Sequence, residues 1–132
     1  MERLYKYMNE ETDCVNLYES TILSIENDLN NKEILFIIDW TEGNPYVLLK
    51  CKTYSNVEIN ILHNEKYGKD WIGTFEITGF SYIKREDYYT VQFNFEHTLI
   101  GYIRIECKSF VCFTPSEPLS CGGNDNLIND YE

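Results

Sequence analysis

Apolar side chains recur at every second position through much of the chain, and this two-residue period predicts β-strands. The clearest case runs from Tyr89 to Phe95, where each odd-numbered residue is apolar and each even-numbered residue is polar. Between Thr21 and Phe113 the pattern predicts about seven short strands separated by turn residues. Because the apolar faces of such strands must pack together, we expect an antiparallel β-sandwich or half-open barrel.

The first part of this region predicts a hairpin. Leu23, Ile25 and Leu29 alternate with polar residues and should face the core. Asn30-Asn31 predicts a tight turn, because asparagine tolerates the positive φ angles that hairpin turns need. The following strand, residues 34–40, is apolar at both odd and even positions, as expected of a central strand covered on two sides.

The middle of the chain predicts three further strands. Residues 46–54 form one, with Val47, Leu49 and Cys51 on one face, and residues 57–61 form a second, separate strand. After a polar loop from 63 to 70, the pattern resumes from 72 to 84, where Gly73 and Gly79 mark places for a bend or bulge.

Near the end of the predicted core the alternation changes phase. Leu99, Ile103, Ile105 and Cys107 share one face, but the parity slips around Ser109, which predicts a bulge or bend before residues 110–113. Residues 1–20 show neither period and predict a short helical or irregular arm. Residues 114–132 have the composition of an acidic C-terminal tail, which Leu119 and other apolar residues could anchor.

Composition supports one mainly β domain. The 132 residues suit a single domain, and 43% of them are hydrophobic, which is ample for one buried core. Alanine is absent while Ile, Val, Thr, Tyr and Phe abound, and this usage favours a pleated sheet over a helical bundle.

The charge balance limits the classes of partner. The chain carries 11 basic and 22 acidic residues, a formal net charge of -11, with no Lys/Arg cluster. Nucleic acid and anionic membranes are therefore not expected partners. A basic protein would be attracted, although the same charge also serves solubility alone. The N-terminus lacks the pattern of a signal peptide and no apolar run reaches membrane-spanning length, so we expect a cytoplasmic protein.

The residues that commonly carry catalysis or metals form no recognisable motif. His63 and His97 are expected in loops, and a Cys–His pair would require the fold to bring Cys51, Cys107 or Cys112 beside one of them. The odd number of cysteines without paired spacing predicts buried, reduced thiols rather than disulfides or zinc ligands. We predict no enzyme activity, no cofactor and no metal.

Aromatic and acidic residues adjoin in two predicted loops, and these are the candidate protein-binding residues. They are Glu65, Tyr67, Asp70 and Trp71 in the first loop, and Glu86, Asp87 and Tyr88 in the second. Aromatic anchors surrounded by charge are typical of protein interfaces. The alternative is that Trp71 and Tyr88 close the core at strand ends, which the usual burial of tryptophan favours.

Two segments carry a family resemblance. Residues 17–25, Leu-Tyr-Glu-Ser-Thr-Ile-Leu-Ser-Ile, precede an Asn-rich turn and an apolar strand. They resemble the Leu-His-Asp-Ser/Ala element of small uncharacterised bacterial proteins, some of which resemble immunity proteins of toxin systems. Residues 103–110 look like the closing strand of that family. Tyr18 and Glu19 stand where that pattern has His and Asp.

The resemblance implies a toxin-neutralising protein that binds one cognate, basic toxin domain through an acidic and aromatic surface. The alternatives are a small-molecule-binding β module, an enzyme without a familiar motif, and an oligomeric structural subunit.

Overall fold

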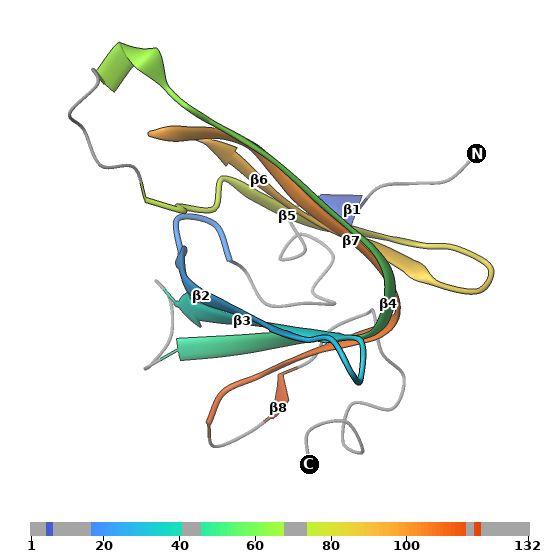
Figure 1. Cartoon of the computed structure of the whole chain (residues 1–132). Coiled ribbons are helices and arrows are strands. Elements are labelled where there is room, and N and C mark those ends of the chain that lie inside the picture. The colour runs from blue at the N-terminus through green and yellow to red at the C-terminus, as the bar shows by residue number, and fades with distance from the viewer. Residues whose placement is uncertain (1–4, 7–16, 41–45, 68–73, 116–117, 120–132) are drawn as a thin grey trace.

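The computed structural model describes residues 5–6, 17–40, 46–67, 74–115 and 118–119, and its strands form one antiparallel sheet (Figure 1). The elements are β1 (Tyr5–Lys6), β2 (Thr21–Asp28), β3 (Glu33–Asp39), β4 (Tyr46–His63), the 3-10 helix η1 (Glu65–Tyr67), β5 (Gly79–Lys84), β6 (Tyr89–Glu96), β7 (Leu99–Phe113) and β8 (Pro118–Leu119). No α-helix occurs in these ranges, and no helix within them has the length and apolarity needed to cross a bilayer. The mainly β fold expected from the sequence is confirmed.

The two longest strands, β4 and β7, connect the two halves of the sheet. The strand order is β1-β5-β6-β7-β4-β3-β2, with β8 paired to β7. β4 and β7 pair antiparallel from Leu48 opposite Phe113 to His63 opposite Leu99. Both strands bend sharply part-way, so that the β2–β3 hairpin turns to face the β5–β6 hairpin (Figure 1).

The bend arises from a bulge in β4, and it corrects one prediction. The pairing with β7 shifts between Tyr54 and Asn56, and Thr53 has a φ of 53°. The two strands predicted at residues 46–54 and 57–61 are therefore one continuous strand, and the prediction of two separate strands was wrong. The mostly polar residues 52–56 around the bulge separate two apolar stretches, which made the sequence look like two strands.

The change of phase predicted near Ser109 coincides with this bend. Cys107 and Phe110 have opposite parity, yet both are buried. The register between β7 and β4 shows no shift from Ser109 to Phe113. The bulge therefore belongs to β4, while β7 follows the bend and changes the face that it buries.

The sheet curls until its two sides meet at one end. The start of β2 forms an antiparallel contact with the segment just before β5. The Ile22 N–H donates to the Phe75 carbonyl at 2.9 Å, and the Ile77 N–H donates to the Ser20 carbonyl at 2.7 Å. Of the strand predicted at 72–84, only Gly79–Lys84 lies in a strand within the described residues. This contact at one end, with open strand edges elsewhere, matches the half-open barrel that the sequence predicted.

A cluster of aromatic rings fills the space between the two halves. The ring of Phe93 in β6 lies 4.8 Å from the ring of Phe36 in β3 and 5.1 Å from that of Phe80 in β5, measured between centroids. The largest fully buried side chains are Phe36, Phe93, Phe95, Phe110, Leu17, Ile38, Leu49, Ile77, Ile103, Ile105 and Val47. The odd-numbered face of β6 and the face of Val47, Leu49 and Cys51 are buried as predicted.

The predicted core face of β2 was wrong at Leu23, and the expected burial of Ile25 and Leu29 was wrong in extent. Leu23, Ile25 and Leu29 are 58%, 38% and 68% exposed, whereas Ile22 is buried. The pairing of β2 with β3 shifts between Ile22 and Ser24, so that Ile22 rather than Leu23 faces the core. Beyond the shift Ile25 lies opposite the buried Phe36 and points to the inner face. Beyond this shift β2 is the outermost strand of its half, and no described strand covers its far side.

The hairpin between β2 and β3 is confirmed, with different turn chemistry from that expected. The turn runs from Leu29 to Lys32, and the positive φ, 56°, belongs to Lys32 rather than to an asparagine. The Asp28 carboxylate accepts hydrogen bonds from the Asn30 N–H at 3.1 Å and from the Asn31 side chain at 2.8 Å. The asparagines thus act as hydrogen-bond donors that hold the turn.

Both terminal segments contribute a short strand. In the predicted N-terminal arm, Tyr5 and Lys6 pair with Tyr82 and Ser81 of β5, a pairing that the sequence did not predict. In the predicted tail, Leu119 pairs with Cys112 of β7, which places the backbone of the expected anchor residue against the sheet. Residues 1–4, 7–16 and 120–132 lie outside the described part of the chain.

Candidate functional site

The candidate interface residues lie in two separate places. Glu65 is exposed in η1, and Tyr67 is the last residue of that helix. Asp70 and Trp71 lie outside the described residues. In the turn between β5 and β6, two further members, Glu86 and Asp87, are exposed and the third, Tyr88, is half-buried, with the Arg85 guanidinium 5.5 Å from its ring centroid.

The pairing register shows that the two groups are far apart. η1 follows His63, which lies opposite Leu99 of β7, whereas the β5–β6 turn leads into Tyr89, which lies opposite Cys107 of the same strand. Eight residues of extended strand, about 26 Å at about 3.3 Å per residue, separate these levels. The structure does not bring the two groups together, and their part in binding stays a prediction.

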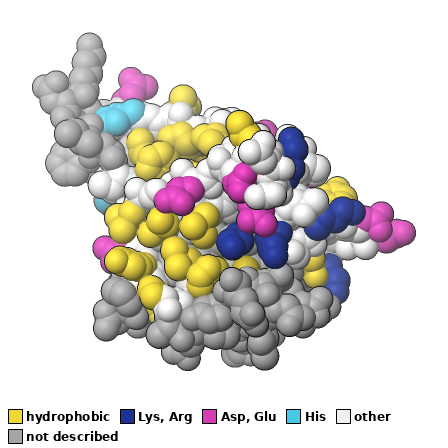
Figure 2. All heavy atoms as spheres, turned by 60° about the horizontal axis from the view of Figure 1, so that its bottom comes forward, with side chains coloured by type: hydrophobic (Ala, Val, Ile, Leu, Met, Phe, Trp, Pro, Cys, Tyr) yellow, Lys and Arg dark blue, Asp and Glu magenta, His cyan; other side chains and the backbone are white. Residues whose placement is uncertain are grey.

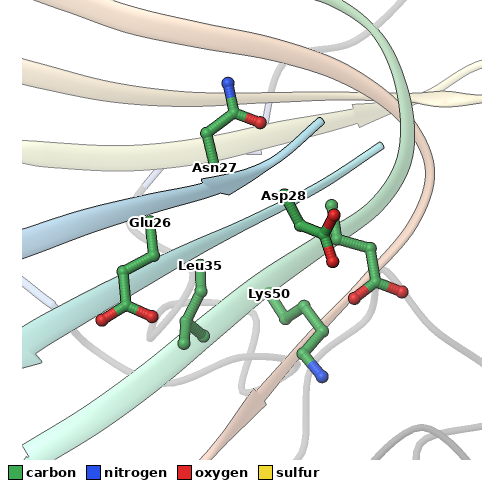
Figure 3. A pocket seen from close by; sticks show the side chains of 6 residues that line it. Glu26, Asn27, Asp28, Leu35 and Lys50 are labelled. Carbon is green, nitrogen blue, oxygen red and sulfur yellow. The ribbon is translucent and has the colours of Figure 1, made fainter. Parts of the chain in front are cut away.

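The sequence did not predict an acidic hollow on the outer face of β2, β3 and β4. Its volume is about 360 Å³, and it is lined by Glu26, Asn27, Asp28, Glu33, Leu35 and Lys50. Figure 3 shows the side chains of Glu26, Leu35 and Lys50 on one side of the sheet, with Asn27 pointing to the other side. We call these six residues the acidic hollow.

The pairing register of β2, β3 and β4 brings the side chains that line the hollow together. Glu26 of β2 lies opposite Leu35 of β3, which lies opposite Lys50 of β4. In an antiparallel sheet, residues directly opposite each other point to the same face, so these three side chains form one row across the strands. Asp28 and Glu33 form the adjacent pair, at the hairpin end.

The hollow is predominantly negative. Three of its lining side chains are carboxylates and one is an ammonium group. The hydrogen bonds from the Asn31 side chain and backbone lower the pKa of Asp28, so this carboxyl stays ionised to a lower pH than an ordinary aspartate. Figure 2 shows acidic and basic side chains adjoining a broad hydrophobic area on the face turned to the viewer.

The neighbouring half of the sheet carries charges that neutralise one another. On β7, the Arg104 guanidinium donates to Glu58 at 3.1 Å and to Gln92 at 2.9 Å, and the Tyr102 hydroxyl donates to Glu58 at 2.7 Å. A carboxylate that is already paired with a cation in this way attracts an outside partner less than the Glu26 and Glu33 carboxylates of the hollow. The acidic hollow therefore carries more uncompensated negative charge than the Glu58 cluster.

The three described cysteines are buried, as predicted, and they are distant from both histidines. Burial, together with the neighbouring Cys107 thiol, raises the pKa of Cys51, and burial raises the pKa of Cys112. His63 and His97 are exposed at the far end of β4 and in the β6–β7 turn. The fold thus forms no Cys–His pair from these residues, and within the described ranges no three His, Cys, Asp or Glu side chains converge as a metal site.

This burial predicts chemical protection of the thiols. In the folded protein, we expect Cys51, Cys107 and Cys112 to resist alkylation by iodoacetamide, because all three sulfurs are shielded from solvent. At Cys51 and Cys112 the raised pKa also disfavours the reactive thiolate. All three should react at once in denaturant, which provides the control. Mass spectrometry of the three peptides measures both states, and fast labelling of any of them in the native protein would contradict the prediction.

Comparisons with known proteins show the fold but no family. No family model and no curated protein matches the chain. The fold is similar to that of a solved structure described as an uncharacterized protein from Neisseria gonorrhoeae. That likeness has a TM-score of 0.55 and 12% sequence identity, and covers 85% of this chain and 96% of the other. At this identity the match shows a shared architecture alone.

Proposed function

We propose that this protein is a toxin-neutralising, immunity-type protein that binds a basic toxin domain through the acidic hollow. The observation that carries the proposal is the group of three carboxylates, Glu26, Asp28 and Glu33, on one open face of the sheet. Net charge of -11 adds a long-range field of the same sign, which raises the rate of encounter with a positive partner. Leu35, between the carboxylates, supplies apolar contact area.

Binding of a small molecule is the alternative, and the lining of the hollow favours it less. A volume of about 360 Å³ lies at the lower end of the range for ligand sites. Such sites are lined mainly by apolar and aromatic side chains, whereas Leu35 is the one apolar member of this lining. A second, smaller hollow of about 160 Å³, near the β4 bulge, is lined by Thr53, Ser55, Tyr88, Cys107 and Lys108.

The proposal is tested by co-expression with the product of the adjacent gene and by pull-down from the native host. We expect one basic protein partner and rescue of growth from its toxicity. In the double variant Glu26→Lys/Glu33→Lys, the association rate should fall by about tenfold or more at low salt, with a smaller loss at high salt. Both side chains lie on the outer face and neither caps the hairpin turn, so the fold should persist.

Charge-reversal variants at η1 and at the β5–β6 turn show which of the three acidic surfaces, these two or the hollow, binds the partner. Glu65→Lys alters η1, and Glu86→Lys/Asp87→Lys alters the β5–β6 turn, and both sites are exposed. If one of these variants loses the partner while the hollow variant retains it, the binding surface is at that other site. Absence of any protein partner, together with absence of rescue, would refute the immunity function itself.

A further inference from the structure

β4 loses one of its two neighbours half-way along its length. Residues 48–52 lie between β3 and β7, but from Asn56 to His63 the strand pairs with β7 only. The last backbone bond on the β3 side is from the Tyr54 N–H to the Lys32 carbonyl, at 2.9 Å. In the part of the chain that the structure describes, residues 56–62 are thus the outer edge of the β4–β7–β6–β5 half (Figure 1).

This segment, which we call the β4 edge, lacks the usual protection of an exposed strand. Residues 56–62 contain no lysine and no proline, the residues that commonly block pairing at sheet edges. Ile59 and Leu62 are 58% and 67% exposed. The single charge, on Glu58, is bonded to Arg104 and Tyr102 of the adjacent strand. An unpaired edge with exposed apolar side chains is a template for another strand.

We propose that the β4 edge pairs with the β4 edge of a second copy of this chain, antiparallel and centred on Ile59, to form a two-fold symmetric dimer. In that register Ile59 lies opposite Ile59 of the second copy, and Val57 lies opposite Ile61. β-Branched pairs of this kind stabilise antiparallel strands. Glu58 lies opposite Asn60, so no two like charges face each other.

Local charge compensation allows a second copy to approach at this edge. A net charge of -11 opposes association of two copies over most of their surface. At the β4 edge, the Glu58 carboxylate is compensated by Arg104, 3.1 Å away, which removes most of the local repulsion. An antiparallel pair of identical edges also closes on itself, so pairing stops at the dimer.

This inference goes beyond the proposed function and does not depend on it. The acidic hollow lies on β2, β3 and the first half of β4, whereas the β4 edge begins after the bulge. Self-association is measured on the purified protein alone, so its outcome is separate from the search for a toxin.

Two measurements test the dimer. Sedimentation equilibrium from low to high micromolar concentration should give twice the chain mass for the native protein. Ile59→Lys places two ammonium groups opposite each other at the centre of the pair, and we expect it to raise the dimer dissociation constant by at least about tenfold. The matched control is Leu29→Lys, which alters a more exposed side chain in the β2–β3 turn and should leave the mass unchanged.

A crosslink identifies the register. Under mild oxidation, Ile59→Cys should form a disulfide between two copies, because residues directly opposite in an antiparallel pair have Cβ atoms about 5 Å apart. Leu29→Cys should not crosslink in this way. A native protein that is monomeric at every concentration would overturn the proposal. So would a dimer that Ile59→Lys leaves intact, or hydrogen-exchange protection of residues 56–62 that arises only when a different protein is added.

Discussion

Replacing Gly101 with alanine should cost the fold about 3 kcal/mol or more of its free energy of unfolding. Gly101 of β7 has a φ of 140°, and a Cβ atom there would lie 1.8 Å from the backbone oxygen of Asn60 in β4. Since backbone on both sides is held by the paired strands, neither can move away without breaking ladder hydrogen bonds. Urea denaturation, followed by circular dichroism, measures the loss.

Gly79→Ala is the matched control for this prediction. Gly79 opens β5, and an added Cβ would meet the Asn94 side-chain nitrogen at 3.3 Å, which is the movable end of a side chain. We expect a loss of about 1 kcal/mol or less. Equal losses for the two variants would show that close backbone approach at Gly101 does not limit stability.

Truncating Phe93 to alanine should destabilise the protein by about 3–5 kcal/mol. Phe93 is fully buried, and its ring contacts Phe36 from the opposite half of the sheet and Phe80 from the neighbouring strand. The cavity left behind would therefore remove contacts both within one half and between the two halves.

The measurement for Phe93→Ala is the urea midpoint at unchanged slope, because an altered slope would indicate a change in the surface exposed on unfolding. Leu29→Ala provides the control: this side chain is 68% exposed in the β2–β3 turn, and its removal should change stability by no more than about 0.5 kcal/mol. A loss below about 1 kcal/mol for Phe93→Ala would contradict its role in joining the halves.

Where apolar and polar residues alternate regularly along the sequence, the structure buries the predicted face of the strand. β6 shows this best, because Val91, Phe93 and Phe95 face the core as their spacing predicted. The β2–β3 hairpin and the burial of Cys51 followed from turn residues and from thiol chemistry in the same way. In each case the signal lies within a few neighbouring residues.

In β2 and β4, bulges made predictions from the apolar alternation wrong. One inserted residue reverses the face of every side chain beyond it, and nothing in the local composition at Leu23 or Ser55 marks the insertion. The bulge in β2 left Leu23 exposed and its neighbour Ile22 buried. The mostly polar residues around the β4 bulge made one eighteen-residue strand look like two.

The acidic hollow was missed for a related reason. Glu26 and Asp28 were recognisable as the polar face of a strand, but their approach to Glu33 and Lys50 depends on register across three strands. The β4 edge likewise exists because β3 ends its pairing at Lys52 while β7 continues.

The amino-acid sequence by itself determined the mainly β fold, the hairpin positions, the buried thiols and the strongly negative charge, because each of these depends on residue type and short-range spacing. Only the tertiary structure decided where the bulges of β2 and β4 lie, which carboxylates share a hollow, and which strand edge is open. Those features depend on pairing between residues distant along the chain, and register is set by the whole sheet at once.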